Sequence, residues 1–259
     1  MLRRPLGDTG LEVSPLGLGT VKFGRNTGVD YPHAYELPSD SLIADLLTQA
    51  RSCGINLLDT APAYGTSEAR IGEAIEGHRD EWVICTKAGE EFDGTKSHHD
   101  FSEDHILGSV EVSLARLRTH TLDILLLHSD GRPVDEIEYL GAFRALSRLK
   151  REGIVRAVGF SGKSPADAEA ALPRSDVLMC TINATYRDEV GLARKAANQG
   201  VGILVKKPLD RGFVGESKTI AETAGLAGVT SVVVGTLSPA HLAANAAAVL
   251  RPTDLSTAV

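Results

Sequence analysis

The sequence is poor in cysteine, in aromatic residues and in long hydrophobic runs. Its 259 residues include three cysteines and one tryptophan, and aromatic residues make up 5% of the chain. Three cysteines are too few for the disulfide framework of a small secreted domain, so we expect reduced, buried thiols. No run approaches the roughly 20 apolar residues that a membrane-spanning helix needs. These absences predict a cytoplasmic protein with no membrane partner.

An excess of positive charge is also missing. Lys and Arg number 27 against 34 Asp and Glu, so the formal net charge is -7. Nucleic-acid-binding surfaces need clustered Lys and Arg, and Lys206-Lys207 is the only adjacent lysine pair. We therefore expect no nucleic-acid partner. Residues 1–7 carry two arginines without an apolar stretch behind them, which is unlike a secretory signal.

Short apolar runs alternate with longer segments of helical period along the whole chain. Eight runs are candidate strands: 16–20, 55–59, 82–87, 123–128, 155–160, 177–182, 201–206 and 231–235. The candidate helices are 41–53, 67–75, 104–118, 134–152, 165–172, 188–198, 218–225 and 239–249. Eight strands, each followed by a helix, in about 250 residues are typical of a closed (β/α)₈ TIM barrel. Residues 1–259 are expected to form this single domain.

The ends and connections of the strands add detail to this prediction. A doubly wound open sheet, the alternative, needs a glycine-rich loop that leads into a helix after an early strand, and Gly17 to Thr20 lack the third glycine and that helix. Residues 4–14 are expected to form a β-hairpin that caps the bottom of the barrel. The long connections 21–40 and 88–102 are expected to wall a substrate pocket, since barrel active sites lie at the strand C-termini.

Four residues with complementary chemistry lie at or just beyond the ends of three successive predicted strands. Asp59, Lys87 and His128 each end a strand, and Tyr64 follows five residues after Asp59. The carboxyl ends of barrel strands meet on one face. A lone charge removed from water is costly, so the acid and the amine are expected to pair or to have a task. We interpret the four residues as a candidate active site.

These four residue types suit the reduction of a carbonyl group. Tyrosine has an ordinary pKa of about 10, and a nearby ammonium is expected to lower it by favouring the phenolate. Lys87 would tune Tyr64, Asp59 would hold Lys87 charged, and His128 would donate to or steer the carbonyl oxygen. Each residue alone has an ordinary structural interpretation. Their order on successive strands favours a catalytic set.

The motifs around these residues resemble those of the aldo-keto reductases nearly end to end. They are 17–20, 54–65, 86–87, 126–128, 159–161 and 235–245. The resemblance implies a barrel that binds NADPH across its top, with NADH as a possible substitute. It also implies that small-molecule aldehydes or ketones are reduced to alcohols by hydride transfer, with Tyr64 as the general acid.

The resemblance further implies a cofactor site at the strand ends. Its expected members are Gly19, Thr20, Val21, Asp59, Ser161, Gly162, Lys206, Lys207, Pro208, Leu209, Arg211, Gly235, Thr236, Ser238, His241 and Asn245. Gly162 stands where many members have asparagine, and Lys206 stands where an aromatic ring often stacks on the nicotinamide. Gly235 and His241 replace a common basic pair for the adenosine 2′-phosphate. We expect Lys206 and Lys207 to contact phosphate, and the preference for NADPH or NADH stays open.

Two other classes of function remain open. The barrel could bind nicotinamide nucleotide and report redox state to a partner protein, with little turnover. It could instead be a lyase or aldolase that uses Lys206 or Lys87 as an amine nucleophile. No metal site is expected, because His98-His99-Asp100 has no further Cys or His at ligand spacing, and a solvated loop is predicted there. The physiological substrate and the oligomeric state do not follow from the sequence.

Overall fold

Eight parallel strands close into a barrel in this computed structural model, which describes residues 1–213 and 217–250. Along the barrel the strands follow one another in sequence order, and β12 pairs back onto β3. The strand bounds are β3 Leu16–Gly19, β4 Leu57–Asp59, β5 Val83–Ala88, β8 Leu122–His128, β9 Val155–Ser161, β10 Val177–Thr181, β11 Gly202–Lys206 and β12 Ser231–Val234. The predicted (β/α)₈ barrel is confirmed.

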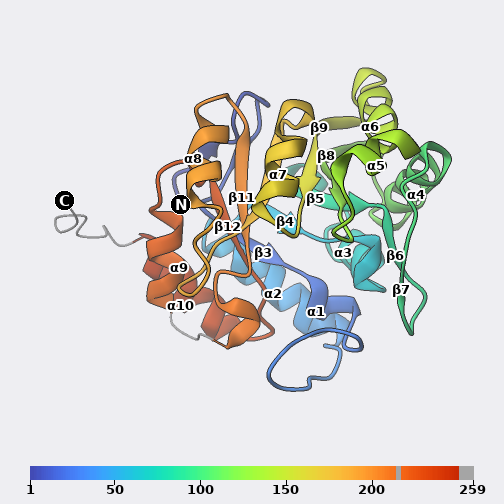
Figure 1. Ribbon diagram of the computed structural model, residues 1–259. Coiled ribbons are helices and arrows are strands. Elements are labelled where there is room, and N and C mark those ends of the chain that lie inside the picture. Colours follow the sequence, from blue (N-terminus) through green and yellow to red (C-terminus); the bar gives the residue numbers. More distant parts are fainter. Residues whose placement is uncertain (214–216, 251–259) are drawn as a thin grey trace.

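Helices surround the barrel, as Figure 1 shows. Their bounds are α1 Val21–Gly24, α2 Asp40–Ser52, α3 Ser67–Ala74, α4 Glu103–Arg116, α5 Val134–Leu140, α6 Ala142–Arg151, α7 Pro165–Ala171, α8 Val190–Ala197, α9 Ser217–Ala224 and α10 Pro239–Leu250. Serines cap several of them; Ser102, for example, accepts a hydrogen bond from the backbone N–H of His105. The predicted helix 134–152 is divided into α5 and α6, because Gly141 has a φ of 102° that a helix cannot contain.

A small β-hairpin closes the bottom of the barrel, as predicted. β1 (Arg4–Pro5) pairs antiparallel with β2 (Glu12–Val13). Leu6, Leu11 and Val13 of this segment pack against the side chains that fill the barrel interior. Those interior side chains are Leu57, Val83, Cys85, Ile124, Leu126, Ala157, Val177, Met179, Leu204 and Val233. The bottom of the barrel interior is therefore sealed by apolar packing, which leaves the open end of the interior at the strand C-termini.

The connection after β5 differs from the solvated loop predicted at residues 98–100. β6 (Glu90–Phe92) pairs antiparallel with β7 (Ser97–His99), and the hairpin extends from the barrel in Figure 1. Backbone N–H groups of Thr95 and Lys96 donate to the Asp93 carboxylate and hold the turn. Asp93-Gly94 is a common hairpin turn pair, so the sequence contained a signal for this element.

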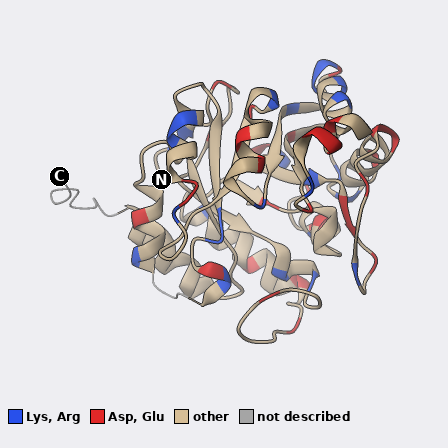
Figure 2. Cartoon of the chain, viewed as in Figure 1, with Lys and Arg blue, Asp and Glu red and all other residues tan. Residues whose placement is uncertain are grey.

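The distribution of charge, the helices and the potential metal ligands bear on which partners the protein could bind. Figure 2 shows Lys and Arg interspersed with Asp and Glu over the outer helices. Within residues 1–213 and 217–250, no helix has the length and apolar character needed to cross a bilayer. The same residues contain no cluster of three or more His, Cys, Asp or Glu that could hold a metal ion.

The hairpin seal predicts an unequal response to two leucine substitutions near the N-terminus. Leu6 is fully buried, whereas Leu2 is 91% exposed. Leu6→Ala should lower the free energy of unfolding by about 2–5 kcal/mol, because it removes buried methyl groups and leaves a cavity. The control Leu2→Ala should change it by less than about 0.5 kcal/mol. Denaturant unfolding of both variants would test this. Equal losses of unfolding free energy would contradict the role of the hairpin in closing the barrel.

Candidate active site

The buried ammonium of Lys87 joins three parts of the candidate site. Its Nζ donates to Asp59 Oδ1 at 2.6 Å, to the carbonyl oxygen of Thr60 at 2.8 Å and to Tyr64 Oη at 3.2 Å. A lysine ammonium has three N–H donors, so all three are used. Lys87 is 1% exposed. The structure thus brings Asp59, Lys87 and Tyr64 together as the sequence predicted.

Local backbone geometry places Tyr64 over the end of β5. After β4, the chain turns through a short 3₁₀ helix, η1 (Pro62–Tyr64), and Gly65 follows with a φ of 63°. A Cβ at Gly65 would lie 2.3 Å from the carbonyl oxygen of Gly24, so glycine is required by space as well as by conformation. Arg25 supports the same turn by donating to the carbonyl oxygen of Ala63 at 2.9 Å.

The electrostatics of Tyr64 differ from the expected lowering of its pKa. Burial raises the pKa of the Tyr64 phenol, and the nearby Asp59 carboxylate adds to the rise. Lys87 acts in the predicted direction but does not outweigh burial. Burial alone would lower the pKa of Lys87, but Asp59 and Tyr64 raise it. The resting site therefore holds a neutral phenol beside a charged ammonium.

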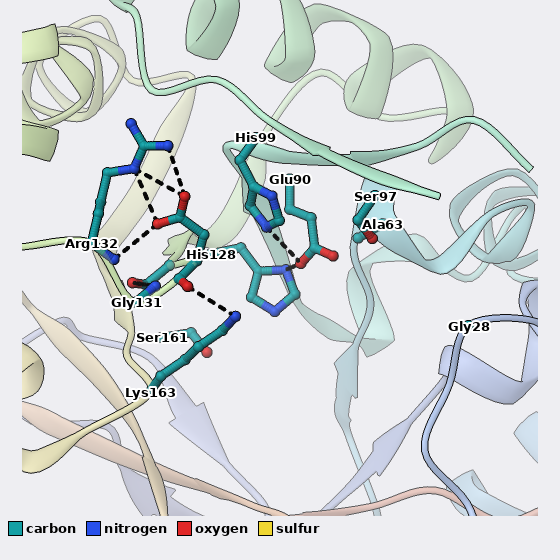
Figure 3. A network of polar contacts seen from close by, with 12 residues as sticks. Gly28, Ala63, Glu90, Ser97, His99, His128, Gly131, Arg132, Ser161 and Lys163 are labelled. Atoms are coloured by element: carbon teal, nitrogen blue, oxygen red, sulfur yellow. Dashed lines mark hydrogen bonds and ion pairs between the residues drawn. The ribbon is translucent and has the colours of Figure 1, made fainter. Parts of the chain in front are cut away.

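His128, at the end of β8, completes the predicted group of four. Its ring meets that of Tyr64 edge to face, with centroids 6.3 Å apart. Its Nδ1 lies 2.8 Å from Oε2 of Glu90 (Figure 3). The sequence interpretation did not name Glu90 as a site residue; it lies in the connection 88–102, which was expected to wall the substrate pocket. The Asp93-Gly94 pair was the local signal that could have placed Glu90 beside a hairpin turn.

A cavity of about 420 Å³ lies at the strand C-termini, within the usual size range of ligand pockets. All four candidate catalytic residues line it. The predicted cofactor residues that line it are Gly19, Thr20, Val21, Asp59, Ser161, Lys206, Lys207, Pro208, Leu209, Arg211 and Gly235. A larger hollow of about 770 Å³, around Arg3 and Arg51, lies at the opposite end, where barrel enzymes do not place their chemistry.

The remaining predicted cofactor residues lie outside the lining of this cavity. Gly162 follows β9, and its carbonyl oxygen accepts from Lys206 Nζ at 2.6 Å. Thr236 and Ser238 precede α10 and His241 lies in its first turn, where the His241 backbone N–H donates to Ser238 Oγ. The side chain of Asn245 is turned to Ser217, whose hydroxyl donates to it at 2.7 Å. Their cofactor contacts stay predictions.

Two basic side chains of the expected phosphate site have partners within the protein. Lys206 Nζ donates to Ser161 Oγ at 2.9 Å as well as to Gly162. Burial and the neighbouring Lys207 lower the pKa of Lys206 to about 8. Lys206 is therefore directed at Ser161, at the end of β9, and not at an outward phosphate position. Arg211 forms an ion pair with Asp30, which links the connections after β11 and β3.

The donor groups around the cavity suit a nicotinamide dinucleotide. Lys207 and Arg211 provide positive charge at its edge, and α10 begins at Pro239, in the segment that follows Gly235. Helix N-termini and basic side chains both favour phosphate. The Ser161 hydroxyl accepts from Lys206, which leaves its own proton to donate to a ligand oxygen.

Comparison with known proteins agrees with this geometry. Residues 15–227 match the model of the Aldo/keto reductase family. The chain belongs to the aldo-keto reductase family. Members of this family are oxidoreductases that use nicotinamide cofactors, NAD(P)H in general.

Relatives with known sequences include other members of the aldo-keto reductase family. The uncharacterized oxidoreductase YqkF of Bacillus subtilis is 30% identical over 227 residues, which cover 82% of this chain and 69% of the relative. L-galactose dehydrogenase of Arabidopsis thaliana is 30% identical over 226 residues, covering 82% of this chain and 67% of that enzyme. The chain spans about two thirds of the length of both relatives.

Solved aldo-keto reductase structures share the fold. A Pseudomonas aeruginosa protein assigned to this family is 46% identical, with a TM-score of 0.87, covering 95% of this chain and 93% of that chain. The holo form of an aldo-keto reductase from Bacillus halodurans is 25% identical, with a TM-score of 0.82, covering 97% and 91%. The barrel described above is thus the fold of the family.

The buried Asp59–Lys87 pair predicts a large stability effect from a small substitution. Asp59→Asn should lower the free energy of unfolding by about 3–5 kcal/mol, because it leaves the Lys87 charge buried without its carboxylate. Adding Lys87→Met to Asp59→Asn should restore part of that loss. The control Asp40→Asn, at an exposed ion pair with Arg70, should cost less than about 1 kcal/mol. Denaturant unfolding measures all three, and a double variant less stable than Asp59→Asn would contradict this account.

Proposed function

We propose that this aldo-keto reductase is an NAD(P)H-dependent enzyme that reduces aldehyde or ketone carbonyls to alcohols. The observation that carries the proposal is the Lys87 ammonium, which joins Asp59 to Tyr64 at the wall of the cavity that His128 also lines. On this proposal the chain is a single-domain cytoplasmic enzyme whose partner is a small carbonyl compound.

The hydrogen bonds of Tyr64 support its role as the proton donor. Its oxygen accepts from Lys87, so the phenolic proton is left to point at another acceptor. A carbonyl oxygen in the cavity can take that proton as negative charge develops on it. Lys87 then stabilises the phenolate that forms, and Asp59 keeps the ammonium charged and in place.

The cofactor would be held by residues on the second half of the barrel. A bound NAD(P)H supplies the hydride that adds to the carbonyl carbon. Ser161 would donate to its carboxamide, while Lys207, Arg211 and the start of α10 would bind its phosphates. We propose NADPH as the cofactor. NADH should also bind, because Gly235 and His241 stand in place of the common basic pair for the adenosine 2′-phosphate.

The two alternative functions make different predictions. A redox-sensing barrel would bind nucleotide without multiple turnovers of any aldehyde. Lys87 is disfavoured as an amine nucleophile for two reasons. Burial lowers its pKa by less than Asp59 and Tyr64 raise it, so the amine stays protonated. Its three N–H donors are also used in hydrogen bonds. Lys206, with a pKa lowered to about 8 by burial, is the better candidate for that chemistry. Borohydride trapping of a carbonyl adduct without nucleotide would support the lyase alternative.

Removing the Tyr64 hydroxyl should separate turnover from binding. Tyr64→Phe should lower kcat for aldehyde reduction by about 10²–10⁴-fold, because it removes the general acid. The dissociation constant for NADPH should change little. Tyr139→Phe, at a residue 85% exposed on α5, is the matched control and should keep full activity. Steady-state kinetics and fluorescence titration measure these quantities, and unchanged kcat in Tyr64→Phe would refute the role.

The proposed phosphate site predicts a charge effect on nucleotide binding. Lys207→Ala should raise the dissociation constants for NADPH and NADH about tenfold, because it removes one charged phosphate contact. Lys195→Ala, at an ion pair with Glu169 on the outer helices, should leave both unchanged. Fluorescence titration with each nucleotide also measures their relative affinity. Equal nucleotide dissociation constants in Lys207→Ala and Lys195→Ala would show that Lys207 does not bind the phosphates.

A further inference from the structure

We propose that Glu90 is a positioning residue that fixes the proton of His128 on Nδ1. The cavity-facing Nε2 then accepts a hydrogen bond when the ring is neutral and donates one only when the ring is protonated. The catalytic consequence of this inference rests on the proposed function, whereas the placement of the proton does not.

The contact between Glu90 and His128 comes from two different elements. Glu90 lies on β6 and His128 ends β8, and their side chains are 15% and 19% exposed. Glu90 Oε2 lies 2.8 Å from His128 Nδ1. In Figure 3 the second ring nitrogen of His128 points away from Glu90. Only Nδ1 can therefore interact with this carboxylate.

The surroundings of Glu90 keep it ionised. His99 Nε2 lies 3.9 Å from its Oε2, and Arg25 Nη1 lies 3.9 Å from its Oε1. Burial alone would raise the pKa of Glu90, but the contacts with His128, Ser97 and His99 lower it to about 2. An ionised carboxylate has acceptors and no donor. It cannot offer a proton to a bare Nδ1.

The proton of His128 is therefore placed on Nδ1. A bare Nδ1 would bring its lone pair to 2.8 Å from a carboxylate oxygen, whereas an Nδ1–H brings positive charge there. The 2.8 Å contact lacks the angle of a hydrogen bond, so Nδ1 and Oε2 interact through their charges. Such a charge contact favours Nδ1–H in the same direction as an aligned hydrogen bond would, because the N–H puts positive charge on the side of the ring that faces the carboxylate.

Several charged and titratable groups face His128 from the elements around it. They are Glu90 and His99 of the β6–β7 hairpin, Tyr64 of η1, Lys87 of β5, Lys206 of β11 and Lys163 after β9. Burial lowers the pKa of His128, Lys87 and Lys206 lower it further, and Glu90 only partly offsets them. The ring is therefore neutral near pH 7 and gains a proton in acid.

On this proposal His128 does not donate at neutral pH, and of the two roles expected from the sequence only the steering of the carbonyl oxygen is left to it. A neutral ring with its proton on Nδ1 presents an unprotonated Nε2 to the cavity. That nitrogen can accept from the hydroxyl of an alcohol but cannot donate to a carbonyl oxygen. Protonation in acid adds a second donor beside Tyr64. Carbonyl reduction should thus accelerate as the pH falls through the pKa of His128, and alcohol oxidation should not.

Nitrogen NMR of the ligand-free protein tests the proton placement directly. With ¹⁵N-labelled histidine, and with His128→Asn used only to assign the signal, Nδ1 should show the protonated-type shift and Nε2 the unprotonated type at pH 7.5. Glu90→Gln should gain the Nε2–H tautomer, because the glutamine amide can donate to Nδ1. Glu91→Gln, at the next residue, should match the parent protein. An Nε2–H tautomer in the parent protein would overturn the inference.

The pH dependence of turnover provides the second measurement. In Glu90→Gln the acid-side rise of kcat for reduction should move to lower pH by about one unit, because a carboxylate that favours the protonated ring is lost. Glu90→Asp is a second variant, used in case Glu90→Gln does not fold. Because it keeps the negative charge, it should retain the Nδ1–H tautomer. Turnover in a parent protein with the Nε2–H tautomer would refute this inference alone. The Nδ1–H tautomer without turnover of any carbonyl would refute the proposed function alone.

Discussion

The Lys87 ammonium is the constraint on which the top of the barrel depends. A buried cation has to be neutralised and fully hydrogen-bonded, and Asp59, Thr60 and Tyr64 do this together. The three acceptors come from one continuous segment, β4 through η1, while Lys87 comes from the neighbouring strand β5. The turn that carries Tyr64 is thus held against the sheet by the same interaction that orients the phenol.

The two ends of the barrel divide stability and chemistry between them. At the bottom, Leu6, Leu11 and Val13 of the N-terminal hairpin seal the interior with apolar packing. At the top, the strand ends carry ionisable groups, and the β6–β7 hairpin adds Glu90 beside His128. Buried charges cost less where partners are available, so the site concentrates its carboxylates, amines and imidazole at one face. This arrangement is why single substitutions at the top should affect both stability and turnover.

Much of this organisation could be predicted from the sequence because its signals are local. Each barrel strand is a short apolar run, and Asp59, Lys87 and His128 lie at or within one residue of the ends of three of them, so barrel geometry alone brings them to one face. The position of Glu90 in the site was not predicted, because β6 and β7 have three residues each and lack an apolar pattern. Its contact with His128 joins residues far apart in the sequence, and only the folded chain shows it.

Side-chain direction and electrostatics were also beyond sequence reasoning. Lys206 ends its strand as predicted, yet its ammonium turns to Ser161 and Gly162 because these acceptors lie beside it on the fold. For Tyr64 the sequence indicated the ammonium that lowers its pKa but not the degree of burial that raises it. The extent of burial depends on the whole packing around the site.

The most direct test of the central claim is isotope transfer from the cofactor. The purified protein would be mixed with NADPH deuterated at C4 of the dihydronicotinamide ring, separately on each face, and with a small aromatic aldehyde. Mass spectrometry of the alcohol would follow. The account predicts one deuterium on the carbinol carbon from one of the two labelled cofactors and none from the other. Alcohol formed without deuterium from either cofactor, or no alcohol across a panel of aldehydes and ketones, would contradict carbonyl reduction at this site.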